Sequence, residues 1–408
     1  EVMRLLWVAT GMLLAAACLR VLWQARRRNV ALWLPAYVKR NWPGRRGSDR
    51  GAGRGPVHIM FCIADHFEPG LFERGIERER RRVEHWLRHY PGLASRFRDA
   101  DGRPPRHTFF YPAEQYRAEH LERLATPVRA GYGEVEVHLH HDADTSAGLR
   151  QKLLEFTERL HGHGHLGTER ASGAVRFGFI HGNWALDNSR PDGRWCGVND
   201  ELRVLRQCGC YADFTFPSAP SPTQTRRINS IYYATDDPAR PKSHDDGVEV
   251  CVGGEPGGDL MLIQGPLGLT WPGGRFGLLP RIETGGIAAG NPPAPRRIAS
   301  WVRARVCVAG RPDWLFVKVH THGCKEANWD VLFGPPMQEL HRHLAQHYND
   351  GRRYTLHYVT AREMYNIVKA AERGLAGDPG EYRDLEVLPP PLAVGEHCGG
   401  RIKQEAIP

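Results

Sequence analysis

The sequence predicts an α/β protein built on a mostly parallel sheet or (β/α) barrel, and three observations support this class. From residue 55 onward, apolar runs rich in Val, Ile and Phe alternate with amphipathic helical segments. The chain of 408 residues is long for one ordinary domain but suits a barrel that carries insertions. Hydrophobic residues make up 41% and charged residues 25%, which is the balance of a globular protein with a buried core.

The predicted elements follow one another in β-then-α order. Short apolar runs predict strands at 57–64, 134–137, 175–180, 211–216, 315–319 and 354–359. Helical periodicity predicts helices at 77–90, 114–125, 149–160, 199–207, 337–347 and 361–372. This repeated order implies parallel strands, because a parallel pair needs a long crossover connection that is usually a helix. Residues 236–311 are Gly- and Pro-rich, which predicts an insertion of loops and short strands within a main domain at 55–375, before an irregular tail at 376–408.

The N-terminal region is predicted to be a membrane anchor (1–24) followed by a basic linker (25–54). Leu5 to Trp23, interrupted only by Arg20, is just long enough to span a hydrocarbon core as a helix. Basic residues concentrate after this segment rather than before it, so the positive-inside rule predicts a single-pass membrane protein with its main domain on the cytoplasmic face. The basic linker would then lie against anionic headgroups. An exported domain and a cleaved signal peptide are the alternatives.

The positive charge is local. Residues 20–54 hold ten Lys or Arg and one acid, Asp49, which accounts for the whole formal net charge of +9. A basic face spread over a folded domain is therefore not indicated, and we expect no nucleic-acid partner. The nine cysteines form no CxxC pair, which predicts reduced cysteines rather than a disulfide framework or a zinc knuckle.

Three of the predicted strands end in clusters of histidine and aspartate. The first runs into Asp65 and His66, the second into the segment His138–Asp142, and the third into His320 and His322. Side chains that follow parallel strands collect at one edge of the sheet, so clusters far apart in sequence are expected to meet. Imidazole and carboxylate together form the ligand set of a catalytic divalent metal such as zinc. The pattern predicts a metal-dependent hydrolase with a divalent metal cofactor, for which zinc is the expected ion.

The order of these strand-end motifs resembles the polysaccharide deacetylase family over residues 57–370. The resemblance implies a distorted (β/α) barrel and the removal of acyl, in particular acetyl, groups from an amino sugar or acylated glycan, either polymeric or lipid-linked. It also implies that Asp65 is the catalytic base and that His66 takes the place of a metal-binding aspartate, although Asp65 could itself bind the metal. The late motif makes His320 the general acid, with His322 as the alternative.

The second motif of the family holds two metal ligands four residues apart. Here His138 and Asp142 have that spacing, with His140 and His141 as competitors. Ligands at i and i+4 share one side of a helical turn, whereas His138 and His140 share a face if the strand continues. The spacing alone leaves both geometries open.

Two middle motifs resemble the family less closely and imply substrate-binding residues. His181 and Trp184 stand where the family has a loop that shapes the pocket, and Asp213 stands where an aspartate orients the catalytic groups. Together with His322 they complete the predicted substrate site. Two other classes fit the same clusters: another metal-dependent amidohydrolase or phosphoesterase on a similar barrel, and a non-catalytic carbohydrate-binding relative.

Overall fold

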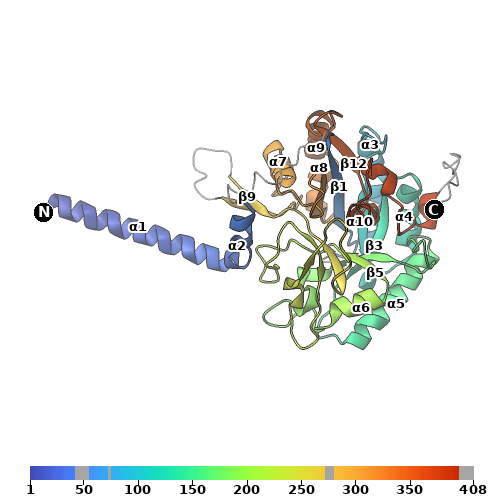
Figure 1. The fold of residues 1–408 in the computed structure, drawn as a ribbon, viewed down its shortest axis with the longest axis horizontal. Coiled ribbons are helices and arrows are strands. Elements are labelled where there is room, and N and C mark those ends of the chain that lie inside the picture. The colour runs from blue at the N-terminus through green and yellow to red at the C-terminus, as the bar shows by residue number, and fades with distance from the viewer. Residues whose placement is uncertain (42–54, 72–74, 272–279, 395–408) are drawn as a thin grey trace.

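The computed structural model describes residues 1–41, 55–71, 75–271 and 280–394 and shows a mixed α/β fold around a 10-stranded, mostly parallel sheet (Figure 1). The strands of this sheet are β1 (Val57–His66), β2 (His107–Pro112), β3 (Gly133–Leu139), β4 (Phe177–His181), β5 (Cys210–Asp213), β6 (Ile231–Ala234), β7 (Gly247–Glu249), β8 (Leu260–Ile263), β11 (Trp314–Thr321) and β12 (Tyr354–Tyr358). A separate antiparallel pair joins β9 (Gly268–Thr270) to β10 (Arg281–Glu283).

The helices of the main body follow the predicted alternation. They are α3 (Ile76–Ala94), α4 (Ala118–Arg129), α5 (Ser146–Gly162), α6 (Glu201–Gln207), α7 (Pro295–Arg303), α8 (Trp329–Leu332), α9 (Pro335–His347) and α10 (Ala361–Glu372). The predicted strands and helices are confirmed with boundary shifts of up to four residues. The prediction missed β2, which pairs in parallel with both β1 and β3.

The strand order of the main sheet is β11-β1-β2-β3-β4-β5-β8-β6-β7. β1 pairs with β11 along 58–65, with β12 along 57–61 and with β2 along 63–66. Every pairing from β11 to β8 is parallel, and only the pairings of β6 with β7 and β8 are antiparallel. The strands that carry the histidine clusters, β1, β3 and β11, therefore all end at the same edge of the sheet.

The two faces of the sheet pack against different layers, and alternation along each strand decides which side chain joins which layer. On β1, Ile59, Phe61 and Ile63 belong to an outer core shared with α3, α4, α5, α6 and α9. The intervening Met60, Cys62 and Ala64 belong to an inner core shared with α10. Because α10 packs against the inner face, nearly all of its residues are buried. We use "inner face" for this α10 side below.

The irregular segment before β11, which contains Val306 and Ala309, connects β11 to the residues that follow β7 at the other end of the sheet. The N–H of Phe316 on β11 donates to the carbonyl of Val306 (2.8 Å), and the N–H of Ala309 donates to the carbonyl of Val250 (2.9 Å), just beyond β7. Val306 and Val308 are buried in the inner core. This segment encloses the inner core on the side where the sheet itself does not continue.

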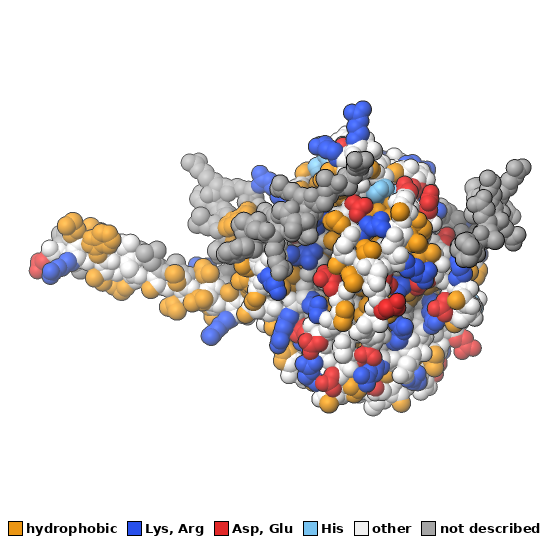
Figure 2. Space-filling view, in the orientation of Figure 1, with side chains coloured by type: hydrophobic (Ala, Val, Ile, Leu, Met, Phe, Trp, Pro, Cys, Tyr) orange, Lys and Arg blue, Asp and Glu red, His pale blue; other side chains and the backbone are white. Residues whose placement is uncertain are grey.

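The prediction of a single-pass membrane protein is wrong. Leu5 to Trp23 lies in the helix α1 (Val2–Arg27), which extends away from the body and carries exposed apolar side chains (Figures 1 and 2). Among the residues that the structure describes, no helix is long and apolar enough to cross a membrane. The prediction that the main domain lies on the cytoplasmic face depended on this membrane span and is wrong for the same reason.

The region predicted as a basic linker contains a docked helix, α2 (Val30–Asn41). Its Trp33 is fully buried against Ala219, Ile228 and Leu267, and the side chain of Asn29 donates to the carbonyl of Pro220 (2.8 Å). Residues 42–54 of the predicted linker lie outside the described residues. Within the predicted tail, Pro379–Tyr382 and Pro391–Val394 form short 3-10 turns, and residues 395–408 are not described.

Candidate functional site

Histidines from three strand ends meet on the inner face of the sheet. His66 ends β1, His138 lies on β3, and His320 lies on β11. The ring of His66 lies 5.0 Å from that of His138 and 6.4 Å from that of His320, measured between ring centroids. His322, two residues beyond His320, stacks on His66 at 4.6 Å. Two-residue alternation thus gathers these predicted residues into one cluster, which we call the histidine centre.

Glu68 provides a carboxylate to this centre, and the sequence analysis missed it. Its Oε1 lies 3.2 Å from Nε2 of His140 and 3.6 Å from Nε2 of His138. Its Oε2 lies 3.8 Å from Nε2 of His322. One ligand atom each from Glu68, His138 and His140 lie within 4.8 Å of one another, which is the separation that a shared ion requires. Glu68 follows His66 by two residues, so the same alternation that placed His66 pointed to it.

Two acceptors outside the centre fix the orientation of its imidazoles. Nδ1 of His138 lies 2.7 Å from the carbonyl oxygen of Ile180, and Nδ1 of His140 lies 2.6 Å from Oε1 of Glu114. A carbonyl accepts only, so Nδ1 of His138 carries the proton, and Nε2 directs its lone pair into the histidine centre. This arrangement is the usual support of a metal-binding histidine.

Gly182 makes room for the ring of His140. A Cβ at that position would lie 2.3 Å from Cδ2 of His140.

Two polar atoms of the histidine centre have no partner. Nε2 of His138 and Oε2 of Glu68 are buried and form no hydrogen bond. Buried polar atoms are normally paired, so these two mark a place where a ligand would complete the contacts.

Burial and mutual contacts shift the protonation of the centre. Burial raises the pKa of Glu68, but the neighbouring His138 and His140 outweigh burial and hold it well below its usual value. Burial lowers the pKa of His140, but Glu114 and Glu68 raise it to about 10. Burial, together with neighbouring His322 and His138, lowers the pKa of His66 well below its usual value. Two carboxylates therefore face one imidazolium, an excess of negative charge that suits a cation, and a metal ion bound there would replace the proton on Nε2 of His140.

One side of the centre reaches solvent. The side chains of His140 and His322 are 28% and 30% exposed, whereas Glu68 and His138 are buried. Trp184 lies on this side, with its ring 6.2 Å from both His66 and His322. Two surface hollows of about 560 and 640 Å³ lie elsewhere, beside α5 and α3, and the second is lined mostly by charged side chains. Volume alone would favour one of the hollows as the functional site, but the donor atoms of several side chains converge at the histidine centre.

The structure places Asp65 on the opposite face of β1 from His66. Its carboxylate is fully buried, where Oδ1 accepts the N–H of Gly323 (2.6 Å) and Oδ2 lies 3.3 Å from Nδ1 of His107. A Cβ at Gly323 would lie 2.2 Å from Oδ2, so only glycine permits this approach. Asp65 therefore holds the chain just after His322. These contacts engage the oxygens that the predicted proton-abstracting role needs.

The other predicted residues separate into different surroundings. Oδ1 of Asp142 accepts the N–H groups of Ala143 (3.1 Å) and Trp195 (2.6 Å), so it holds a turn and is not grouped with His138. Asp213 accepts from both the N–H and the hydroxyl of Thr215, near the buried Lys318.

His181 and His320 complete the set of predicted residues. His181 lies on the outer face and joins a second group, described below. His320 stays with the histidine centre, where burial, Lys318 and His322 lower its pKa to about 3.

Comparisons with known proteins leave the family open. No family model matches the chain, and no curated protein matches it. A solved structure from Mycobacterium smegmatis, provisionally assigned as a polysaccharide deacetylase, is similar to 79% of this chain and 93% of its own, with 13% identity and a TM-score of 0.36. Similarity of this degree assigns neither a family nor an activity.

Proposed function

We propose that the protein is a metal-dependent hydrolase that removes acyl groups from an amino sugar or an acylated glycan. One observation carries the hydrolase part: Glu68, His138 and His140 present three donor atoms within 4.8 Å of one another, beside a partly exposed side. The acyl-glycan part rests on the order of the strand-end motifs in the sequence.

The donor set fits zinc. Two imidazoles and one carboxylate form the three-ligand set of catalytic zinc sites, which keeps a position open for water or substrate. Both histidines have Nε2 turned to the centre and Nδ1 held by an acceptor. A divalent ion held there would lower the pKa of a bound water towards ~7 and polarise a carbonyl oxygen.

Residues beside the ligands would bind substrate and move protons. His66 is neutral near pH 7, since its pKa is lowered well below 6.5, so it can form hydrogen bonds to a substrate but is a weak base. His322 stacks on it and reaches solvent, which places it to exchange a proton with a leaving group. His320 is also neutral and has no extra proton to donate. Trp184 offers an aromatic surface against which a sugar ring would pack.

The test is acyl release by the full chain. The protein is incubated with N-acetylated and O-acetylated glycans, with chelator, and with chelator followed by added zinc, and free acetate is measured. We expect release that chelator abolishes and zinc restores. Glu68→Gln is the matched inactive variant, because it keeps the side-chain volume but removes the charge.

Other outcomes separate the remaining classes. Release of phosphate from phosphate esters, without acetate release, would identify a phosphoesterase. Glycan binding without turnover of any substrate would identify a carbohydrate-binding relative. Either result overturns the deacylase proposal.

A further inference from the structure

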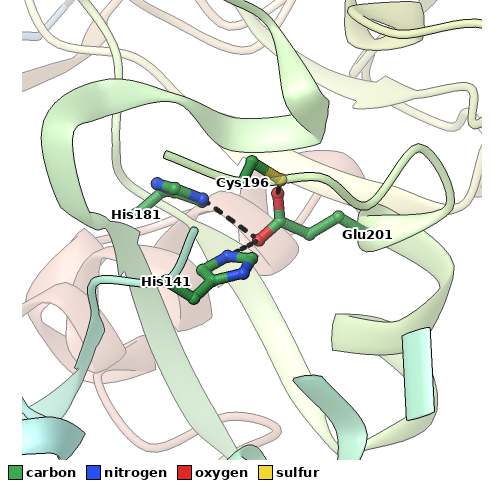
Figure 3. A group of neighbouring side chains, drawn as sticks. All are labelled: His141, His181, Cys196 and Glu201. Atoms are coloured by element: carbon green, nitrogen blue, oxygen red, sulfur yellow. Dashed lines mark hydrogen bonds and ion pairs between the residues drawn. The ribbon is translucent and has the colours of Figure 1, made fainter. Parts of the chain in front are cut away.

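A second group of ligand-type side chains lies on the outer face of the sheet, next to the histidine centre. It consists of His141, His181, Cys196 and Glu201, all buried, whose donor atoms lie within 4.8 Å of one another (Figure 3). His141 follows β3, His181 ends β4, Cys196 lies in the loop between β4 and α6, and Glu201 begins α6. We call this group the outer cluster. No cysteine takes part in the proposed catalytic site, so the two groups differ in chemistry.

The separations within the outer cluster are close to those of tetrahedral coordination. Oε1 of Glu201 lies 3.1 Å from Nε2 of His141 and 3.5 Å from Nε2 of His181, and Oε2 of Glu201 lies 3.3 Å from Sγ of Cys196. Bonds of about 2.0–2.3 Å to zinc in a tetrahedron place ligand atoms roughly 3.3–3.7 Å apart. Figure 3 shows both rings and the sulfur directed at the Glu201 carboxylate.

The surroundings turn the donor atoms inward. Nδ1 of His181 contacts the carbonyl of Gly182, whereas Nδ1 of His141 lies 3.2 Å from Oδ2 of Asp144 without forming a hydrogen bond. Nε2 of His181 therefore faces the cluster, where it is buried and forms no hydrogen bond. Outer acceptors of this kind orient metal-binding histidines.

The sulfur also has the contacts of a thiolate ligand. Backbone N–H groups of Asn188 and Val198 donate to Sγ of Cys196, at 3.3 and 3.4 Å. Donors to sulfur stabilise its negative charge, which a metal-bound cysteine carries.

We propose that the outer cluster binds a structural zinc ion through His141, His181, Cys196 and Glu201. Two imidazoles, one thiolate and one carboxylate suit a borderline-soft ion, and four protein ligands in a closed, buried set are typical of structural zinc. The ion would fasten the loop 182–200 to the ends of β3 and β4. Binding releases the thiol proton of Cys196, and no electron transfer is involved.

A structural ion there would also support the histidine centre. The loop 182–200 holds four non-glycine residues at positive φ among 183–188, and Trp184 is one of them. Such conformations cost of order 1–3 kcal/mol each and persist only where the surroundings hold them. Because Trp184 contacts His66 and His322, the ion would fix one wall of the candidate active site.

The decisive variant is Cys196→Ser in the full chain. A serine hydroxyl can still donate to Glu201, so a purely hydrogen-bonded cluster would survive the change, but it is a poor zinc ligand. Cys210→Ser is the control, because Cys210 is also buried but lies in the outer hydrophobic core, where its sulfur donates to the carbonyl of Ala212 (3.4 Å). Zinc content is measured by elemental analysis after exhaustive dialysis. We expect Cys196→Ser to lose about one ion per chain and Cys210→Ser to lose none.

Cobalt substitution gives a spectroscopic measurement that does not depend on enzymatic activity. The wild-type protein alone already tests the proposal. Cobalt(II) bound to a cysteine thiolate gives a charge-transfer absorption band, which we expect in the wild type and in Glu68→Gln but not in Cys196→Ser. Loss of turnover in Glu68→Gln with the band retained would separate the two sites. If wild-type protein shows no thiolate band, or if Cys196→Ser keeps its full zinc content, the outer cluster is a hydrogen-bonded core and the proposal is overturned.

Discussion

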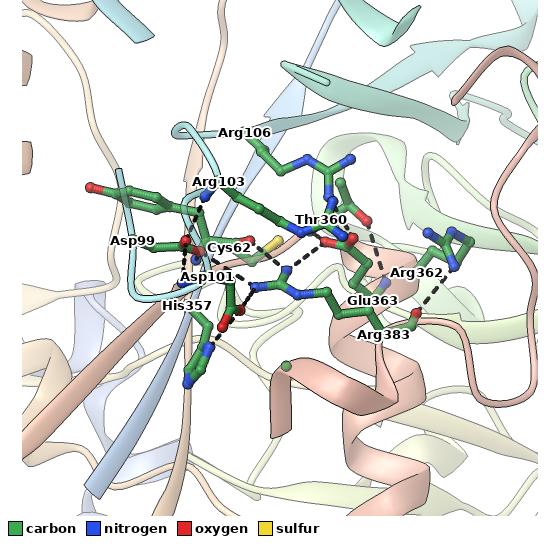
Figure 4. A network of polar contacts seen from close by, with 12 residues as sticks. Cys62, Asp99, Asp101, Arg103, Arg106, His357, Thr360, Arg362, Glu363 and Arg383 are labelled. Carbon is green, nitrogen blue, oxygen red and sulfur yellow. Dashed lines mark hydrogen bonds and ion pairs between the residues drawn. The ribbon is translucent and has the colours of Figure 1, made fainter. Parts of the chain in front are cut away.

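The inner face of β3 contributes to two regions that treat buried charge differently. Glu134, near the start of the strand, belongs to a network of arginines and carboxylates around the beginning of α10. Figure 4 shows Arg106, Arg362, Glu363 and Arg383 of this network. His138, near its end, belongs to the histidine centre. Both regions bury titratable side chains on the same face of the same strand.

In the arginine network, opposite charges meet directly. Glu134 receives Nε and Nη2 of Arg362 at 3.0 and 2.8 Å, and Glu363 receives Arg106 and Arg383 at 2.5 and 3.1 Å. Nε of Arg106 and of Arg383 lack a hydrogen bond, but each guanidinium still pairs with a carboxylate.

In the histidine centre, by contrast, a carboxylate oxygen and an imidazole nitrogen are left without a hydrogen bond. Burying a charge is costly unless it is paired, so we assign the paired network a role in stabilising the fold. We assign the incompletely paired histidine centre a role in binding a ligand.

The largest expected effect is that of Glu68→Gln on activity. Removing the only carboxylate among the three grouped donors weakens ion binding and removes several kcal/mol of transition-state stabilisation, a loss of turnover on the order of 10³-fold. The melting temperature should change less than in Glu363→Gln, because the imidazolium of His140 keeps Glu114 as its partner at 2.6 Å. Acetate release, bound metal and thermal unfolding are measured beside Glu119→Gln, a control on the exposed side of α4. Unchanged metal content would show that Glu68 is not a ligand.

Glu363→Gln should reverse this pattern. Breaking a buried ion pair costs roughly 3–5 kcal/mol of unfolding free energy, because Arg106 and Arg383 lose their shared charge partner. Glutamine can keep the cap that residue 363 forms with Thr360 at the start of α10. Turnover per folded molecule should stay at the wild-type level. Denaturant unfolding measures the free energy of unfolding. A fall in activity with no change in stability would contradict the distinction between the arginine network and the histidine centre.

The same residue gives the network a pH dependence. Burial raises the pKa of Glu363, but Arg106 and Arg383 outweigh burial and hold it below the ordinary 4.5. A carboxylate with a depressed folded-state pKa stabilises the fold above its unfolded value, and this contribution is lost as the pH falls from about 4.5 downward. Wild-type stability should therefore fall more steeply with acid than that of Glu363→Gln. Parallel unfolding curves below pH 4.5 would show that Glu363 does not carry the effect.

Glu114→Gln tests the support of the centre rather than its ligands. The variant weakens the acceptor that holds Nδ1 of His140, and changes of this kind cost about 10–100-fold in metal affinity or activity. Overall stability should be close to wild type. Metal affinity is measured by competition with a chelator, again with Glu119→Gln as the control. An affinity equal to wild type would mean that His140 is not held for metal binding.

The sequence predicted the positions of the strands better than the face of the sheet on which each side chain lies. Strand-end clusters identified β1, β3 and β11, whereas β2 was missed because it ends in Pro112 and carries no cluster. The segment predicted to span a membrane forms a helix, but apolar composition alone did not determine its role.

Within the site, two-residue alternation was the underused signal. It sends His66 and Asp65 to opposite faces, although the family resemblance assigned both to one site. It also separates His140, in the histidine centre, from His141, in the outer cluster. Asp142 was chosen for a helical spacing, but the chain turns there, with Ala143 at a φ of 47°. Cys196 and Glu201 lie in a loop and at a helix start, where no periodic pattern marks them.

Asp65→Asn is expected to have the smallest effect, about 10-fold on turnover. Asparagine can still accept the N–H of Gly323 through its amide oxygen, but it replaces the charge that lies beside His107. The loss should therefore come from a small displacement of His322 rather than from a missing base. Bound metal should equal that of the wild type, and the pH profile of turnover should keep its shape. A loss as large as that of Glu68→Gln, with metal retained, would instead assign Asp65 the proton-abstracting role that its strand-end motif predicts.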